Sequence, residues 1–390
     1  MEVKVLTLHD EKCQLLRKVM TPGEYPEKVP LYLNLQGWLV FKGADQGYLE
    51  SVYDSDKLLN AYRKAIQEYP ADLYYDTGGY AFMGFSRCLG SEDYYLNEEK
   101  YSLNFKDISY LTEDEEYRWL ADDPKGFLWN HFYRRKFRNF SPDQFEKTIQ
   151  NYLELTNIHF DKVTAMKKEM EETCGSVFLS DVPMYQTAFD YLFQYIVGMK
   201  GISMAMRRKK DLLTAALDSF EQLFTGYMDS MSPSLPDTMP FQNQVCLLGQ
   251  ALTNPKQFEP FIWRHLGERI GKMSENGRKF YFMVEGSAGV LLDYLDRIPD
   301  GSCALHIEND ALEDLTARFG NKFTYVGGMP VSLLGTGTRQ ECEDHAKKIL
   351  ERYGHNGNFI FSTDKGIVFE TDAKRDNLKA VCDVVNNFVP

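Results

Sequence analysis

The second half of the chain alternates short apolar runs with amphipathic stretches. Four runs of aromatic and aliphatic residues end at an acid, a glycine or a serine, and they occupy residues 279–286, 303–308, 323–328 and 358–366. Unbroken apolar runs of this length are typical of parallel strands that helices cover on the outside. We therefore predict a buried parallel sheet. Helical patterns between and after these strands cover residues 288–295, 311–319, 340–353 and 374–388.

The first half continues the alternation less regularly. Its strand candidates are residues 29–36, 71–76, 176–183 and 243–249, and Asp54 is the expected N-cap of a helix that runs to residue 69. Further helices are expected over residues 143–172, 184–197, 210–231 and 254–276. Eight strands alternate with helices from end to end, and no GxGxxG follows the first strand. This pattern favours a single (β/α)8 TIM barrel over an open doubly wound sheet.

The barrel is expected to occupy residues 31–390, after a polar N-terminal lead-in of residues 1–30. A long insertion, residues 80–140, follows the second strand and is rich in Tyr and Phe. Loops of such length usually cover or carry a functional site. We expect no second domain.

The net charge and the cysteine content limit the classes of binding partner and the cellular compartment that we expect for this protein. The net charge of −13 disfavours nucleic acid and anionic membranes, which bind clustered Lys and Arg. No apolar stretch approaches the roughly 18 residues that a membrane span needs. The seven cysteines are scattered and form no CxxC pair, as expected for reduced thiols in a cytoplasmic protein. The oligomeric state stays open, with a homodimer as one alternative.

Five acids follow predicted strands, namely Asp76, Asp181, Glu285, Glu308 and Asp364. The C-terminal ends of parallel strands meet at one face of a barrel, so these carboxylates are expected to converge there. Converging carboxylates push one another's pKa values apart, which can produce an acid and a base or a site for a hard metal ion. The alternative is structural, because Asp and Glu commonly cap the helix that follows a strand.

For two residues the sequence favours one role, functional or structural, over the other. Glu285 comes directly after an unbroken apolar strand and before Gly286, a residue that permits close approach of a ligand, so we favour a functional role. His306 lies within a strand between Leu305 and Ile307. A lone histidine in that position is more often buried and hydrogen-bonded than a ligand.

The chain resembles the uroporphyrinogen decarboxylase superfamily over residues 30–388. The most specific piece is VGGMPVSLLGTGTRQE, followed by a strand that alternates glycine with phenylalanine. The pieces that carry the resemblance in the second half are residues 254–266, 282–287, 296–301, 326–341 and 357–381. The resemblance implies a single (β/α)8 barrel.

One activity in that superfamily is cofactor-free decarboxylation of uroporphyrinogen. The resemblance places an arginine-rich motif, which binds the substrate's carboxylates, near the N-terminus. The matching residues 34–49 contain no arginine, and an acidic protein suits a substrate with eight carboxylates poorly. We therefore do not expect this activity.

The other activity is methyl transfer between a small substrate and the cobalt of a separate corrinoid protein. Its thiol-methylating members bind zinc through an HxC pair and a later Cys, and the matching positions here are Met283, Glu285 and Ser362. The thiolate ligands are therefore absent. Any metal would need oxygen ligands, from Glu285 with Glu308 or Asp364.

The segments FMVEGS and IPDG resemble those of a subgroup linked to demethylation of methoxylated compounds such as aromatic methyl ethers. The leading hypothesis is a methyltransferase that passes a methyl group from a small methoxylated or methylated donor to a corrinoid protein. Glu285 would act at the reacting oxygen, with Asp76, Asp181, Glu308 and Asp364 as candidate partners. Two alternatives remain: a decarboxylase-like lyase for a small carboxylated substrate, and a non-catalytic ligand-binding barrel.

Overall fold

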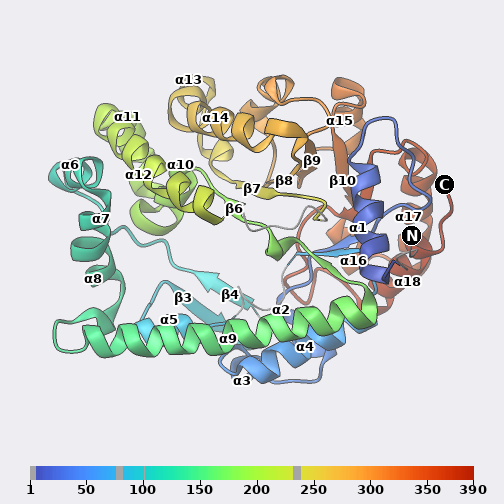
Figure 1. The fold of residues 1–390 in the computed structure, drawn as a ribbon, viewed down its shortest axis with the longest axis horizontal. Helices are drawn as coiled ribbons and strands as arrows, with labels where there is room; N and C mark the ends of the chain where they lie inside the picture. Colours follow the sequence, from blue (N-terminus) through green and yellow to red (C-terminus); the bar gives the residue numbers. More distant parts are fainter. Residues whose placement is uncertain (1–5, 76–81, 101, 232–238) are drawn as a thin grey trace, which may run out of the picture.

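The computed structural model describes residues 6–75, 82–100, 102–231 and 239–390. The chain has a mixed α/β fold built on parallel sheets (Figure 1). A six-stranded sheet has the order β11-β10-β9-β8-β7-β6. Its strands are β6 (Met184–Tyr185), β7 (Asn243–Leu247), β8 (Phe280–Val284), β9 (Cys303–Ile307), β10 (Thr324–Met329) and β11 (Phe359–Thr363). The four strands predicted in the second half are confirmed as β8 to β11.

A smaller parallel sheet has the order β1-β2-β5. Its strands are β1 (Tyr32–Leu33), β2 (Leu73–Tyr74) and β5 (Val177–Phe178). Two isolated parallel bridges lie between this sheet and the β11 region: Leu31 pairs with Phe361 of β11, and Leu35 pairs with Ile367 beyond its end. Side chains from both sheets pack in one interior cluster, and this arrangement is consistent with the predicted (β/α)8 barrel.

The helices lie outside the sheets. Figure 1 shows α13 to α15 on one side of β6–β10, and α4 with α9 on the opposite side of the molecule. Those that follow the strands are α2 (Gly37–Gly43), α3 (Tyr48–Val52), α4 (Ser55–Glu68), α9 (Phe145–Cys174), α10 (Ala188–Tyr191), α11 (Gly198–Arg208), α12 (Lys210–Met231), α13 (Pro255–Phe258), α14 (Arg264–Met273), α15 (Leu312–Phe319), α16 (Val331–Thr336), α17 (Arg339–Tyr353) and α18 (Arg375–Asn386).

Local sequence explains where several helices begin. The side chain of Asp54 accepts hydrogen bonds from the amides of Asp56 and Lys57, so the predicted N-cap of α4 is confirmed. Thr338 and Glu341 form a reciprocal capping box at the start of α17. That helix then buries Cys342, Ala346, Leu350 and Tyr353, one residue per turn, against the sheet. Among the described residues, no helix is long and apolar enough to cross a membrane.

The lead-in contains a helix, α1 (Leu8–Val19), which the sequence analysis did not predict. It buries Cys13, Leu16 and Val19 in the interior cluster of the sheets. The hydroxyl of Thr324, the first residue of β10, donates to the carbonyl of Val19 at 2.9 Å. The helix therefore packs at the N-terminal end of the strands.

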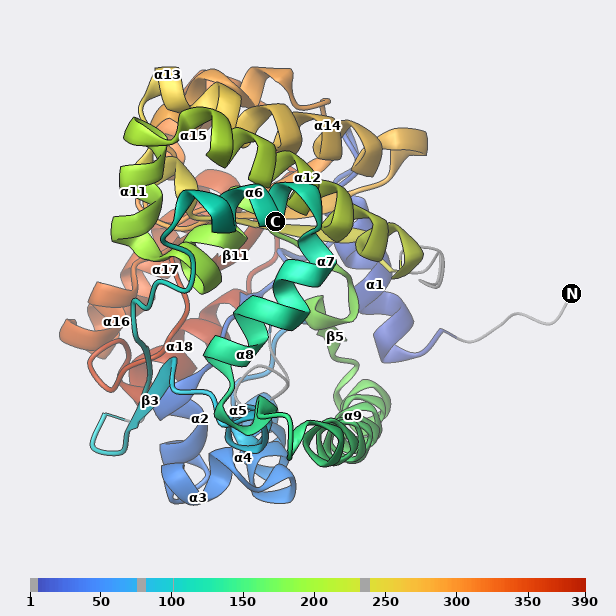
Figure 2. The ribbon, with the colours of Figure 1, turned by 90° about the vertical axis from the view of Figure 1, so that its left-hand side faces the viewer.

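The insertion after β2 forms a separate group of elements. They are α5 (Gly84–Leu89), the antiparallel hairpin β3 (Tyr94–Asn97) and β4 (Ser102–Phe105), α6 (Asp114–Asp122), α7 (Pro124–Phe127) and α8 (Tyr133–Lys136). Figure 2 shows α6 to α8 in front of the rest of the chain, between α12 and α9. Arg135 pairs with Glu116 at 2.8 Å within this group, so it is engaged inside the insertion.

Candidate active site

Glu285 lies at the C-terminal end of β8, one residue beyond the strand. Side chains alternate along a strand, so Glu285 lies on the same side of β8 as Tyr281 and Met283, which pack in the interior cluster. The amide of Glu285 still donates to the carbonyl of Leu247 at 3.0 Å. Gly286 then adopts a left-handed φ of 71°, which turns the chain away from the sheet. The carboxyl group therefore lies on the side of the sheet that carries the interior cluster, at the C-terminal ends of the strands.

The surroundings of Glu285 raise its pKa to about 7. Burial is the main cause, and the negative charge of Glu308 adds to it. The thiol of Cys246 donates to Oε1 at 3.5 Å and acts in the opposite direction, while Asp190 adds a smaller increase of the pKa. At neutral pH both protonation states of Glu285 are populated, as a general acid requires.

Glu308 and Asp364 extend this site. Oε2 of Glu308 accepts a hydrogen bond from the amide of Gly286 at 2.8 Å, and Oδ1 of Asp364 accepts one from the amide of Val331 at 2.9 Å. Burial raises the pKa of both carboxyl groups, and the charge of Asp364 also raises the pKa of Glu308. Glu308 and Asp364 thus each accept a hydrogen bond from a backbone amide. Electrostatic interactions also link the carboxyl groups, because the charge of Asp364 raises the pKa of Glu308 and the charge of Glu308 raises the pKa of Glu285. We call Glu285, Glu308 and Asp364 the acid chain.

Asp181 does not belong to the acid chain. The predicted strand over residues 176–183 is interrupted by the 3-10 turn η3 (Leu179–Asp181), and the chain then continues as β6 alongside β7. The predicted strand end at Asp181 is therefore wrong, because the extended chain ends near Tyr185. The carboxylate of Asp181 forms an ion pair with Lys167 of α9. Asp76 lies outside the described residues.

Asp190 is the acid that actually follows this extended chain, and the sequence analysis missed it. It is fully buried, and burial raises its pKa to about 6. Its Oδ1 accepts hydrogen bonds from the amides of Leu248 at 3.1 Å and Gly249 at 2.6 Å. A signal was present: Thr187 caps the amide of Asp190, and a Thr three residues before an acid marks a helix start.

Gln250 is a second residue that the sequence did not reveal. Its Nε2 donates to the carbonyl oxygens of Glu285 at 2.6 Å and Ser287 at 3.3 Å. Gln250 therefore fixes the turn after β7 against the turn after β8, and Asp190 fixes the turn after β7 against α10. These contacts hold the backbone of Glu285 in place.

His306 is a satisfied core residue, as predicted. Its Nε2 donates to the carbonyl of Thr363 at 2.9 Å, so Nδ1 accepts from the hydroxyl of Tyr281 at 2.6 Å. Burial lowers the pKa of the imidazole to about 4. His306 is therefore neutral at physiological pH, and both of its nitrogens are engaged within the core.

The donor set does not fit a thiolate metal site. In the part of the chain that the structure describes, no three His, Cys, Asp or Glu residues are grouped to hold a metal ion. Cys246 lies beside Glu285, but burial raises the pKa of its thiol well above the ordinary value and keeps it protonated. Ser362, at the second expected thiolate position, is buried within β11. The three carboxyls of the acid chain do not form such a group among the described residues, so oxygen ligation of a metal at Glu285 stays a prediction.

Comparison with known proteins settles the family. Residues 187–388, just over half of the chain, match the family model for uroporphyrinogen decarboxylase. The chain belongs to the uroporphyrinogen decarboxylase family. This confirms the family predicted from the sequence, and the matched range contains the whole acid chain and Asp190.

A solved structure shares the fold of this uroporphyrinogen decarboxylase family member over nearly its full length. A methyltransferase from Methanosarcina mazei matches with a TM-score of 0.64 and 14% sequence identity, covering 98% of this chain and 99% of that one. At such low identity the likeness establishes the fold alone. No protein of curated function matches the sequence.

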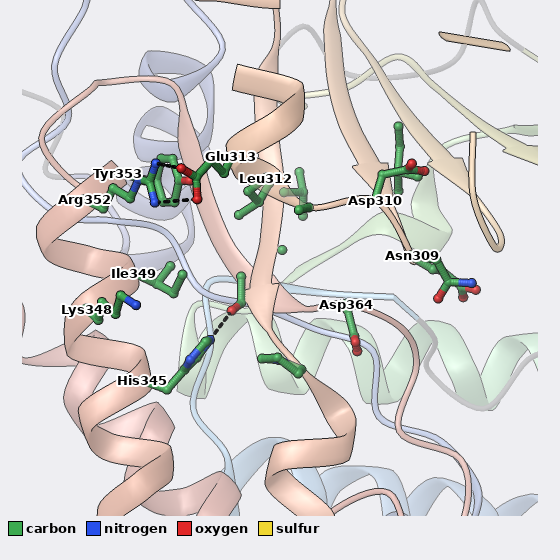
Figure 3. Close-up of a pocket in the computed structure, with 17 residues that line it drawn as sticks. Asn309, Asp310, Leu312, Glu313, His345, Lys348, Ile349, Arg352, Tyr353 and Asp364 are labelled. Atoms are coloured by element: carbon green, nitrogen blue, oxygen red, sulfur yellow. Dashed lines mark hydrogen bonds and ion pairs between the residues drawn. The ribbon is translucent and has the colours of Figure 1, made fainter. Parts of the chain in front are cut away.

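Two members of the acid chain, Glu308 and Asp364, also border a pocket of about 380 Å³, whose lining does not include Glu285. Figure 3 shows Leu312 from α15 and His345, Lys348 and Ile349 from α17 around it, with Asp364 on the opposite side. Glu308 and Asp364 line both this pocket and the strand ends.

Proposed function

We propose that this protein is a methyltransferase of the uroporphyrinogen decarboxylase family. It takes a methyl group from a small methoxylated or methylated donor, with an aromatic methyl ether as the favoured class, and transfers it to the cobalt of a separate corrinoid protein. The two parallel sheets would form a single (β/α)8 barrel over residues 31–390, and the C-terminal strand ends would form its mouth. The observation that carries the proposal is the buried carboxyl of Glu285, with a pKa of about 7, at that mouth.

The chemistry requires an acid of this kind. An aryl methyl ether is a poor methyl donor because phenolate is a poor leaving group. When the methyl carbon is attacked, the C–O bond breaks, and its electron pair stays on the oxygen. A proton delivered to that oxygen by Glu285 turns the leaving group into a neutral phenol. The corrinoid of the partner protein would supply the nucleophile that accepts the methyl group.

The neighbours of Glu285 prepare it for this step. The Cys246 thiol donates to Oε1, so the proton of the neutral carboxyl belongs on Oε2, free to be given to a bound ether oxygen. The charge of Glu308 favours the protonated form. Gln250 holds the backbone of Glu285, and Asp190 holds the turn that carries Gln250, so both limit the movement of the acid.

The matched family model favours a second candidate, decarboxylation of a small carboxylated substrate. Release of carbon dioxide without any corrinoid would identify it. The acid chain argues against this candidate, because its carboxylates repel a carboxylated ligand.

Replacing Glu285 by Gln tests the proposal. We expect Glu285→Gln to lose formation of the demethylated phenol, measured by chromatography with a reduced corrinoid protein as acceptor. Asp181→Asn is the matched control, because Asp181 is paired with Lys167 in the broken third strand. Equal activity of the two variants would overturn the role of Glu285.

A further inference from the structure

We propose that the pocket between α15 and α17 is an entry site that binds the methyl donor beside the acid chain, separate from the barrel mouth. This inference rests on the proposed function. During transfer, the corrinoid protein must cover the mouth for its cobalt to reach the methyl carbon. A small donor then needs another route to the acids, and this pocket is bordered by two of them, Glu308 and Asp364.

Two adjacent glycines of β10, Gly327 and Gly328, line the pocket. A Cβ atom built on Gly328 would lie 2.7 Å from Ile349 of α17 and 3.6 Å from Leu312 of α15, so this glycine faces both helices. The absent side chain therefore leaves room between the strand and the two helices. Gly327 and Gly328 have φ values of 136° and 106°, a conformation that disfavours replacement by a larger residue.

The walls of the pocket are largely apolar. Leu312 of α15 faces Ile349 and Tyr353 of α17 across it (Figure 3). Val326 of β10 also lines the pocket. At the outer rim, Arg352 pairs with Glu313 through two contacts of 2.8 and 2.9 Å. This ion pair joins the two helices at the rim.

The inner end of the pocket is polar. Glu308 and Asp364 line it there, and each uses one oxygen to accept a backbone amide. Glu285 itself does not line the pocket, but Glu308 does, and its Oε2 accepts the amide of Gly286, the residue that follows Glu285. Apolar walls that lead to hydrogen-bonding carboxyls suit a ring with an ether or hydroxyl group.

The size of the pocket fits a donor of one aromatic ring. A cavity of about 150 Å³ accommodates benzene. At about 380 Å³, this pocket has room for a ring with methoxy and hydroxyl substituents. A tetrapyrrole does not fit into this pocket, because the volume of its four rings is larger than that of the pocket.

Two neighbouring lysines of α17 provide a matched test. Lys348 and Lys347 are both exposed, but only Lys348 lines the pocket. With 2-methoxyphenol as donor and the corrinoid protein as acceptor, we expect Lys348→Trp to lower kcat/KM for the donor about tenfold. We expect kcat/KM for the acceptor to stay unchanged, and Lys347→Trp to behave as the wild type. Leu312→Trp narrows the pocket from the other wall and should reproduce the effect.

Free cob(I)alamin as acceptor separates the entry site from a general loss of activity. It leaves the mouth open to the donor, so the decrease of kcat/KM in Lys348→Trp should be less than about twofold. An equal decrease with both acceptors, or no decrease with either, would overturn the entry site while leaving methyl transfer intact.

A binding measurement tests the pocket even if the proposed methyl transfer is wrong. If the wild type transfers no methyl group, saturation-transfer NMR with 2-methoxyphenol still reports on the pocket. A signal that falls in Lys348→Trp but persists in Lys347→Trp supports binding there. Equal signals in the two variants, or no signal from the wild type, overturn it.

Discussion

The Glu285→Gln variant should lose activity and gain stability at the same time. Gln has nearly the shape of Glu and keeps an oxygen that accepts the Cys246 thiol, but it cannot titrate. In the wild type, raising the pKa from the ordinary 4.5 to about 7 increases the protonated fraction at pH 7 from about 0.3% to about one half. Burial thus creates the acid that catalysis uses.

The same pKa shift destabilises the folded protein above pH 7. Below about pH 4.5 the carboxyl is protonated in the folded and unfolded chains, so it has no pH-dependent effect on stability. Between pH 4.5 and 7 the unfolded chain ionises and the folded chain resists ionisation, so folding loses free energy. The loss reaches at most about 3 kcal/mol above pH 7, from 2.5 pKa units of about 1.4 kcal/mol each.

Thermal unfolding measured from pH 4.5 to 8.5 tests this magnitude. A chain of 390 residues has an unfolding entropy of about 0.8 kcal/mol per kelvin, so 3 kcal/mol corresponds to about 4 °C in Tm. We expect Glu285→Gln to gain about this much at pH 8 and nothing near pH 4.5, while its turnover falls about 10² to 10⁴-fold. Glu351→Gln, at an exposed position of α17, controls for loss of any surface charge.

Two results would refute the reasoning. A Tm difference that does not change with pH would show that Glu285 does not carry a raised pKa in the folded protein. Full turnover in Glu285→Gln would show that its proton is not used.

Three other variants test the site: two should shift the pH dependence of kcat/KM in opposite directions, and the third should leave activity unchanged. Glu308→Gln removes a charge that raises the pKa of Glu285, so the high-pH decline of kcat/KM should move to lower pH. Cys246→Ala removes a hydrogen bond that lowers this pKa, and the decline should move to higher pH; identical profiles in both would contradict the coupling. Asp181→Asn should keep full activity and lose at most about 1 kcal/mol in denaturant unfolding, because its ion pair is only partly buried.

The sequence predicts the second half of the fold better than the first. The strands β8 to β11 are unbroken runs of apolar residues, and the helices α15, α17 and α18 follow them with clear periodicity. In the first half, β1, β2, β5 and β6 are two residues long, and tertiary packing decides where they lie. The polar pair Ser180 and Asp181 ends the apolar pattern although the extended chain resumes at β6.

The candidate site likewise contains residues that the sequence predicts and residues that it does not. The side-by-side placement of Glu285, Glu308 and Asp364 follows from a general property of parallel sheets, that strand ends meet at one edge. Thr187 marks a helix start at Asp190, but the hydrogen bonds of Asp190 and Gln250 join segments 35 to 59 residues apart, and no local pattern in the sequence encodes such contacts.

Methyl transfer to cobalt(I) is the most direct test of the central claim. The purified protein, a reduced cobalt(I) corrinoid protein and one member of a panel of methoxylated aromatics or methylamines are mixed, and the cobalt(I) absorbance is followed. The account predicts loss of this absorbance and appearance of methylated corrinoid with one class of donor, only in the presence of the enzyme. An unchanged cobalt(I) spectrum across the panel, with the matching corrinoid protein supplied, would contradict it.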